Sequence, residues 1–344
     1  MDLHDVKKHL QNHLSDGLVV VIGSGLSCAE GMPGMGALAD HLLTEVPECL
    51  DKEKDKAIWG LVASKLSAGV DLESTLLEVQ VSELLEEKIA NITHAFILRH
   101  EQQIISDVFL GDRVLRFSRL LPHLLKPKMG IPVVTTNYDR LVEVAAECVG
   151  IAVNDSFSGK HVGSFNPRES KLSLCRSVTQ RGKKVLLKYA DHLSVYKPHG
   201  SLDWFRVNNE PVSSNIFLGG EKLIITPGAN KFRGGYERPF DSHREMANKA
   251  IDGASRFLII GYGFNDEHLQ VHLERQIDKG RPTVVITHSI TTEFRGYLRG
   301  KPSVWVVCSR PEEKGFTLIA DESEIEFDDI NIWDLDEFVS EVLE

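Results

Sequence analysis

The chain has 344 residues, 42% of them hydrophobic and 26% charged, and a formal net charge of −11. This is the composition of a globular protein with a large core, and the negative charge argues against a general attraction to nucleic acid or anionic membranes. Five scattered cysteines without a C-x-x-C pair, strand-sized apolar runs and a charged amphipathic start predict a cytoplasmic protein with reduced thiols, no zinc ribbon, no leader and no membrane span.

The first predicted strand, residues 18–22, is followed by a glycine-rich turn. Apolar residues at helical spacing over 2–15 lead into this strand, whose unbroken run Leu-Val-Val-Val-Ile is typical of burial on both faces of a parallel sheet. At Gly23-Ser24-Gly25 the missing side chains allow a tight turn and the close approach of a ligand. If a helix begins here, its free N–H groups form an anion site, most often for phosphate. A tight turn without a ligand is the alternative.

Residues 37–130 read almost wholly as helices. Apolar residues at helical spacing recur from Leu38 to Val108, and no proline lies between Pro47 and Pro122. We therefore expect a helical module inserted into an α/β domain. Its apolar faces must be covered by one another, by the sheet or by a second subunit.

A second predicted core strand, 131–135, runs into Thr136-Asn137-Tyr138-Asp139 and a helix that ends near Gly150. Residues 151–184 are polar with little periodicity, which predicts loops or a mobile flap. Short strands over 185–189 and 193–197 then lead to Pro198-His199-Gly200.

The last third alternates between helix and strand. A helix near 240–253 precedes the strand 257–260, which breaks at Gly261-Tyr262-Gly263 before a helix begins at Asn265-Asp266, and strands 283–286 and 304–307 flank a helix near 290–299. Such alternation predicts an α/β fold with a Rossmann-like, doubly wound, mostly parallel sheet that binds ligands at the carboxyl ends of its strands.

The predicted domain division follows from these patterns. Residues 1–36 and 131–312 form the Rossmann-like domain, residues 37–130 the inserted helical module, and residues 313–344 an acidic C-terminal segment. After Lys314 this segment has no further Lys or Arg, so it is a solvated acidic surface or a docking face for a basic partner.

Four segments follow one another, each at a predicted strand end: Gly23-Ser-Gly-Leu-Ser27 with Gly31-Met-Pro33, Thr135-Thr-Asn-Tyr-Asp139, Lys197-Pro-His-Gly-Ser201 and Gly261-Tyr-Gly-Phe-Asn-Asp266. Together they resemble the sirtuin-like NAD-binding domain, in the branch found in bacterial anti-phage NAD hydrolases. The resemblance implies NAD as substrate and no metal. It implies a pyrophosphate cradle of Gly23, Ser24, Gly25 and Ser27, a nicotinamide-ribose and water site at Asn137 and Asp139, a catalytic His199, an adenosine-side loop at Gly261, Tyr262, Gly263 and Phe264, and further NAD contacts at Pro33, Thr136, Asn265 and Thr287.

The chemistry is consistent with these residue types. Cleavage of the bond between nicotinamide and ribose creates an oxocarbenium-like centre and releases neutral nicotinamide, so the site must hold the ribose, orient a water and accept a proton. The amide of Asn137 offers one acceptor and two N–H donors without charge, and His199 can take a proton near neutral pH. The alternatives are that Asn137, Asp139 and Asn265-Asp266 cap helices and that His199 makes a structural hydrogen bond.

The resemblance implies an NAD glycohydrolase that yields nicotinamide and ADP-ribose and depletes NAD during phage infection. Control would come from a homo-oligomer or from a partner, either a HerA-type ATPase/helicase or a short Argonaute, without direct contact to nucleic acid. The alternatives are a catalytically silent NAD or ADP-ribose sensor, a protein deacylase, which usually carries a zinc ribbon, and cyclisation of ADP-ribose after the same cleavage. A dehydrogenase fits poorly, because Cys28 stands where its third glycine belongs.

Overall fold

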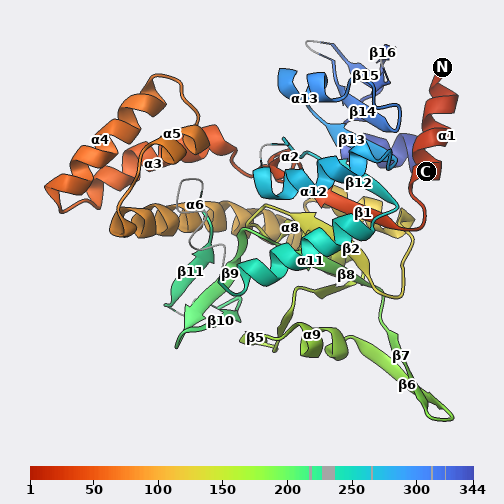
Figure 1. Cartoon of the computed structure of the whole chain (residues 1–344), viewed down its shortest axis with the longest axis horizontal. Coiled ribbons are helices and arrows are strands. Elements are labelled where there is room, and N and C mark those ends of the chain that lie inside the picture. The colour runs from red at the N-terminus through yellow and green to blue at the C-terminus, as the bar shows by residue number, and fades with distance from the viewer. Residues whose placement is uncertain (217–218, 227–236, 265, 311–312, 322) are drawn as a thin grey trace.

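A large mixed sheet runs through the centre of the molecule (Figure 1). The computed structural model describes residues 1–344 except 217–218, 227–236, 265, 311–312 and 322. Within these described residues the sheet has nine strands, in the order β16-β15-β14-β13-β12-β1-β2-β8-β3. From β14 to β3 all neighbours are parallel, whereas β15 and β16 are antiparallel. The bounds are β1 Leu18–Ile22, β2 Ile131–Thr135, β3 Ala152–Asn154, β8 His192–Tyr196, β12 Arg256–Ile260, β13 Thr283–Thr287, β14 Val304–Ser309, β15 Gly315–Ala320 and β16 Ser323–Asp328.

Strand β1 lies between β12 and β2, in the middle of the sheet. Val20 and Ile22 belong to the core on one face of the sheet, and Val19 and Val21 belong to the core on the other. This explains the unbroken apolar run, because both faces of the strand are buried. Full burial of one such side chain contributes about 1.5–3 kcal/mol.

Helices cover both faces of the sheet, which confirms the predicted doubly wound α/β fold. One face packs against α1 Leu3–His13, α7 Arg116–Leu120, η1 Leu121–His123, α8 Leu141–Cys148, α14 Leu335–Phe338 and η2 Val339–Leu343. The other face packs against α11 Phe240–Gly253, α12 Glu267–Asp278 and α13 Thr292–Tyr297. The described part of the chain has no helix with the length and hydropathy of a membrane span.

A helical region projects from the sheet at the side opposite the chain termini (Figure 1). It consists of α3 Met35–Glu48, α4 Glu53–Ser67, α5 Leu72–Glu78 and the first half of α6 Glu83–Leu110, which share a separate apolar core that runs from Leu38 to Ile89. The second half of α6 returns to the main core, where Ile104 is buried. The module boundaries 37–130 remain a prediction.

A second, smaller sheet is formed by strands that precede and follow β8 along the chain. In the described residues its order is β11-β9-β10-β5-β4, and β6 and β7 form a separate hairpin. The bounds are β4 Phe157–Ser158, β5 Gly163–Phe165, α9 Pro167–Ser173, β6 Cys175–Arg181, β7 Lys184–Tyr189, β9 Gly200–Val207, β10 Glu210–Ser213 and β11 Glu221–Ile224. The prediction of loops or a flap over 151–184 was therefore wrong. Strands of two or three residues are too short to show alternation, and β6 is exposed along nearly its whole length.

The C-terminal helix η2 lies beside the N-terminal helix α1 (Figure 1). Within the acidic segment 313–344, β15 and β16 extend the central sheet, and η2 packs on α1. Lys7 pairs with Glu341 at 2.8 Å, so α1 and η2 are joined by charge as well as by apolar contact.

Candidate active site

A cavity of about 230 Å³ opens at the carboxyl ends of β1, β2 and β12. The chain leaves β1 toward β2 on one side, and β12 occupies the other side, so the cavity lies at a topological switch point of the sheet. Its lining residues are Gly23, Ser24, Ser27, Cys28, Met32, Pro33, Gly34, Met35, Leu38, Glu73, Ile97, Thr136, Asn137, Tyr138, Asp139, His199, Ile225, Tyr262, Gly263 and Asp266.

Two glycine loops pack backbone against backbone beside the cavity. The N–H of Gly25 donates to the carbonyl of Gly261 at 2.9 Å, so that amide is not available to a ligand. A Cβ at Gly25 would lie 2.7 Å from Gly261 Cα, and Gly261 itself has φ +58°. These positions therefore require glycine. The short helix α2 Ser24–Ala29 begins directly at this contact.

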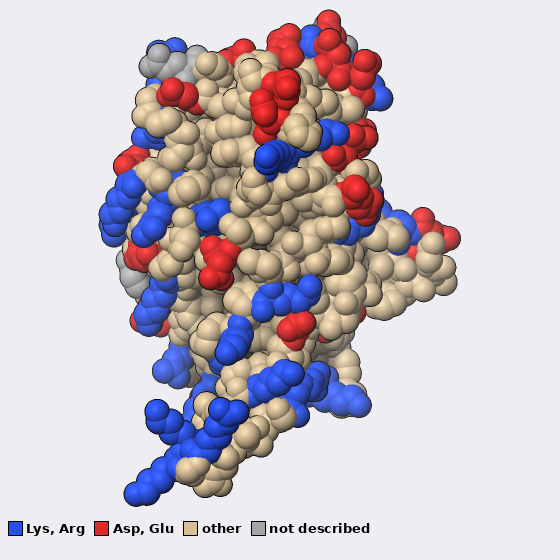
Figure 2. Space-filling view, turned by 90° about the vertical axis from the view of Figure 1, so that its right-hand side faces the viewer, with Lys and Arg blue, Asp and Glu red and all other residues tan. Residues whose placement is uncertain are grey.

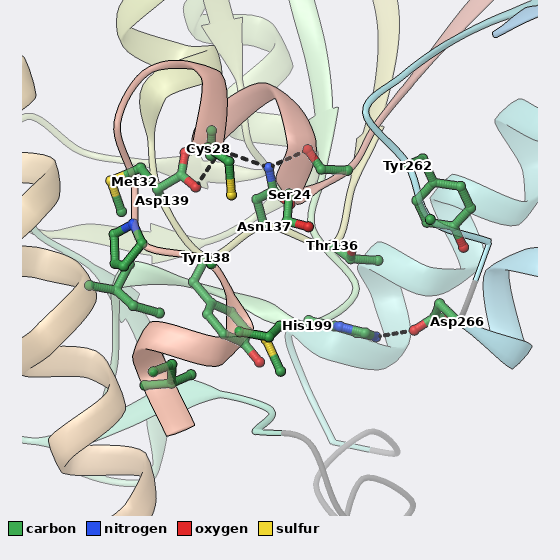
Figure 3. Close-up of a pocket in the computed structure, with 18 of the residues that line it drawn as sticks. Ser24, Cys28, Met32, Thr136, Asn137, Tyr138, Asp139, His199, Tyr262 and Asp266 are labelled. Carbon is green, nitrogen blue, oxygen red and sulfur yellow. Dashed lines mark hydrogen bonds and ion pairs between the residues drawn. The ribbon is translucent and has the colours of Figure 1, made fainter. Parts of the chain in front are cut away.

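The side chain of Asn137 is held by the loop that follows β1 (Figure 3). Its Nδ2 donates to the Gly23 carbonyl at 3.0 Å and to Ser27 Oγ at 2.9 Å. Because a carbonyl can only accept, the NH₂ group must face Gly23, which fixes the orientation of the amide. Both N–H donors are then occupied, and Oδ1 is left as the acceptor of this buried side chain.

Asp139 continues the same hydrogen-bond chain. Its Oδ2 accepts from Ser27 Oγ at 2.8 Å, and its Oδ1 accepts from the backbone N–H of Leu141 at 3.2 Å, in the first turn of α8. Asp139 thus satisfies one N–H group of the first turn of α8, although the N-cap position is Arg140, and the carboxylate also orients Ser27. Burial, with a smaller contribution from the charge of Asp139, raises the pKa of the neighbouring Cys28 thiol, which keeps it protonated at neutral pH.

His199 pairs with a carboxylate in the wall of the cavity. Its Nε2 lies 2.7 Å from Asp266 Oδ2 (Figure 3), and Asp266 also accepts from the N–H of Leu269 at 2.9 Å, as the N-cap of α12. A carboxylate this close to Nε2 favours the tautomer that carries its proton there, which leaves Nδ1 as the basic atom. The sequence suggested only the capping role of Asp266, because its contact with His199 depends on how α12 docks.

A buried lysine supports the loop that carries Asn137. Lys197, 1% exposed, donates from Nζ to the backbone carbonyls of Tyr138 and Asp139 and pairs with Glu143 at 3.0 Å. It acts as a positioning residue that sequence reasoning missed. The available signal was a charged residue directly after the apolar run of β8.

The remaining walls come from several parts of the chain. Tyr138 donates its hydroxyl to the Ile225 carbonyl at 2.5 Å, and burial raises the pKa of this phenol, so it stays protonated. Leu38, Glu73 and Ile97 reach the cavity from α3, α5 and α6. The helical region is thus part of the pocket.

The predicted site residues that the structure describes fall into three groups. Ten of them line the cavity: Gly23, Ser24, Ser27, Pro33, Thr136, Asn137, Asp139, His199, Tyr262 and Gly263. Gly25 and Gly261 form the backbone contact beside it, whereas Phe264 is buried against Phe294 with ring centres 3.7 Å apart, and Thr287 hydrogen-bonds to the Ser289 carbonyl at the end of β13. Asn265 lies outside the described residues.

Comparison with known proteins gives one sequence match and several remote structural ones. Residues 132–301 match a family whose model is described as SIR2-like domain. No curated protein matches the chain. A solved structure described as "Structural Basis for the Mechanism and Regulation of Sir2 Enzymes" is 12% identical, with a TM-score of 0.42 over 85% of this chain and 90% of that one. A structure described as "Sir2 bound to acetylated peptide" is 13% identical, with a TM-score of 0.40 over 85% and 89%. The matched range begins in β2 and ends after α13, so β1 and its glycine loop precede it.

Proposed function

We propose that this chain is an NAD glycohydrolase that cleaves NAD to nicotinamide and ADP-ribose. The observation that carries the proposal is the convergence of three features on one cavity at the switch point: a glycine loop, the oriented amide of Asn137, and the imidazole of His199 paired with Asp266. The SIR2-like match over residues 132–301 supports NAD as the substrate.

The proposed step is balanced without any group beyond NAD and water. The bond between the ribose C1′ and the nicotinamide nitrogen breaks, its electron pair leaves with nicotinamide, and nicotinamide departs neutral. A water oxygen bonds to C1′ and gives its proton to Nδ1 of His199. Asp266 stabilises the imidazolium until the proton passes to solvent. Asn137 Oδ1 accepts a hydrogen bond from the water or from a ribose hydroxyl.

The first test is NAD cleavage by the purified full chain, with the products separated by chromatography. We expect nicotinamide and ADP-ribose in equal amounts. His199→Ala should lower kcat by about 10²-fold or more, since a positioned acid–base group contributes about 10²–10⁴-fold. Asn137→Ala should also lower kcat by about 10²-fold, because it removes the acceptor that positions the water or the ribose. His4→Ala, an exposed residue of α1, serves as the matched control and should leave the rate unchanged.

Three outcomes would change the proposal in different ways. Tight NAD binding by the wild type without cleavage would favour the silent sensor. A cyclic product would mean that a substrate group replaces water as the nucleophile. NAD-dependent removal of an acyl group from a peptide, with little cleavage in its absence, would favour the deacylase.

We further propose that NAD depletion serves anti-phage defence, under the control of an oligomer or of a partner such as a HerA-type ATPase/helicase or a short Argonaute. The resemblance of the four motifs to defence NAD hydrolases supports this role. Host cells that express the wild type should lose NAD and give fewer plaques on phage challenge than cells that express His199→Ala. Equal plaque counts over a broad panel of phages, with and without such a partner, would reject it.

A further inference from the structure

The β6–β7 hairpin stands away from the rest of the molecule (Figure 1). Residues 175–189, here called the basic arm, contain five Lys and Arg and no Asp or Glu, in a chain whose net charge is −11. These five are Arg176, Arg181, Lys183, Lys184 and Lys188, and all are exposed. Within the part of the chain that the structure describes, the arm's strands pair only with each other.

The two faces of the basic arm differ. The register pairs Val178 with Leu187 and Gln180 with Val185, so these side chains share one face. On the other face Arg181 pairs with Lys184, Thr179 with Leu186 and Ser177 with Lys188, so this face carries three of the basic side chains and one exposed leucine. The apolar face is open to solvent, with Val178 65%, Val185 61% and Leu187 40% exposed. An isolated two-stranded hairpin is only marginally stable in water, and an exposed apolar face is typical of an interaction site. We therefore expect this face to be covered by a partner.

The opposite end of the molecule carries the reverse charge. The outermost strand of the central sheet, β16 Ser323–Asp328, contains Glu324, Glu326 and Asp328 and no Lys or Arg, and Asp321 and Asp329 flank it. We call this segment the acidic edge. Arg295 pairs with Glu324, whereas Arg310 is shared among Glu313, Glu326 and Asp328. Carboxylates therefore outnumber their local cations.

Each feature also has a simpler interpretation. Charges on an edge strand prevent unwanted strand pairing, and a basic hairpin can bind phosphate groups of nucleic acid. Two observations favour a protein partner. The apolar face of the arm has no counterpart in a phosphate backbone, and a complementary acidic surface exists on the chain itself. Figure 2 shows Lys and Arg gathered at the arm's end of the molecule and Asp and Glu gathered at the other end.

We propose that the basic arm of one copy docks on the acidic edge of a second copy. Because arm and edge lie at opposite ends, the contact is head to tail, and repetition gives a ring or a filament rather than a two-fold dimer. The outer edge of β16 and the edges of the hairpin can pair as strands, while opposite charges select the partner. This inference does not depend on NAD cleavage, because its readout is assembly.

Sedimentation velocity of the full chain at several protein concentrations tests the proposal. We expect species larger than the monomer that dissociate in salt of about 1 M, where the Debye length falls to about 3 Å. The arm variant Arg181→Glu, Lys184→Glu, Lys188→Glu should be monomeric. A second variant, Val178→Ser with Leu187→Ser, should weaken assembly without a change of charge.

A charge swap distinguishes direct docking from a general charge effect. The edge variant Glu324→Arg, Glu326→Arg should also be monomeric, and mixing it with the arm variant should restore assembly. The matched control Lys8→Glu, Lys54→Glu, Lys279→Glu changes the net charge as much as the arm variant does, at exposed lysines elsewhere, and should assemble normally. A monomeric wild type, unchanged assembly of the arm variant, or binding of duplex DNA or RNA through the arm by a monomer would overturn the proposal.

Discussion

The carboxylate of Asp266 makes two interactions, a helix cap and an ion pair, and a substitution can remove the second while keeping the first. It caps α12 through Leu269 and pairs with His199 at 2.7 Å. A carboxylate beside Nε2 of an imidazole favours the tautomer protonated there and stabilises the protonated ring. The reactivity of His199 is therefore set by a residue from a different element.

Asp266→Asn should separate the two roles. Asn is also a good N-cap, so we expect the melting temperature to remain close to that of the wild type. The altered hydrogen bonding at Nε2 should lower kcat for NAD cleavage by about 10²–10⁴-fold, with a smaller change in KM and a shifted pH–rate profile. Steady-state kinetics from pH 5 to 9 measure this. An unchanged pH profile would mean that Asp266 is only a cap.

Lys197 holds the loop that carries Asn137, and its replacement should lower the free energy of unfolding. Lys197→Met leaves Glu143 buried without its cation, and we expect a loss of about 3–5 kcal/mol in the free energy of unfolding. Adding Glu143→Leu should recover much of that loss, because no charge then remains buried. Denaturant unfolding measures both, with the exposed Lys249→Met as a control that should change stability by less than about 0.5 kcal/mol.

Single residues differ in how far the sequence could place them. Gly23, Asn137 and His199 each follow an apolar strand, and the parallel sheet brings such ends together, so a shared cavity could be expected. The pairing of His199 with Asp266 could not, because it joins residues 67 positions apart through the docking of α12. The buried ion pair of Glu101 with Arg140 is a similar long-range contact, and no local pattern indicates it.

At the level of elements, the loops after β1 and β12 form one unit because their backbones touch. This contact sets the distance between the two strand ends that enclose the cavity. Apolar runs with clear turn residues made β1, β2, β12, β13 and β14 predictable. The short strands β4 and β5 and the exposed β6 were missed, because hydrophobic periodicity reports burial and these strands bury little or have too few residues.

Gly25→Ala tests that backbone contact. The new Cβ would lie 2.7 Å from Gly261 Cα, so the two loops must move apart. We expect a loss of about 1–3 kcal/mol in stability, as for other overpacked sites, together with weaker NAD binding by calorimetry. Gly36→Ala in α3 is the matched control. Nothing lies within 4 Å of its Cβ, so it should leave binding intact and raise stability slightly. Equal effects of both changes would contradict the proposed contact.

For the whole molecule, buried titratable groups make stability depend on pH. Burial lowers the pKa of His13 to about 4 and that of His243 to about 3, whereas burial raises the pKa of Asp155 to about 7. Between pH 6.5 and 4 the two histidines are protonated in the unfolded chain but neutral in the folded protein, so the free energy of unfolding decreases as the pH falls. Asp155 acts in the opposite direction, since its stabilising effect is complete below its unfolded pKa and is lost as the pH rises through about 7.

Between its folded and unfolded pKa values each of these groups changes the free energy of unfolding by about 1.4 kcal/mol per pH unit, so the combined contribution of the two histidines and the aspartate is a net loss on acidification. Denaturant unfolding at pH 7, 6 and 5 should show it. His13→Gln, which retains a donor for the Phe257 carbonyl, should flatten the decline, and Asp155→Asn should steepen it. Identical slopes in all three proteins would refute this assignment.

Leu38 belongs both to the wall of the cavity and to the core that holds α3 to α6 together. A ligand that fills the cavity therefore contacts a side chain of the core that holds the helical region together. Amides of α3 to α6 should exchange hydrogen more slowly when NAD is bound, while those of β16, the outermost strand of the central sheet, should not change. The coupling is reciprocal: if bound NAD changes the affinity of the helical region for a partner, that partner changes the affinity for NAD by the same factor. A contact on the outer surface of these helices could therefore control NAD binding without reaching the cavity.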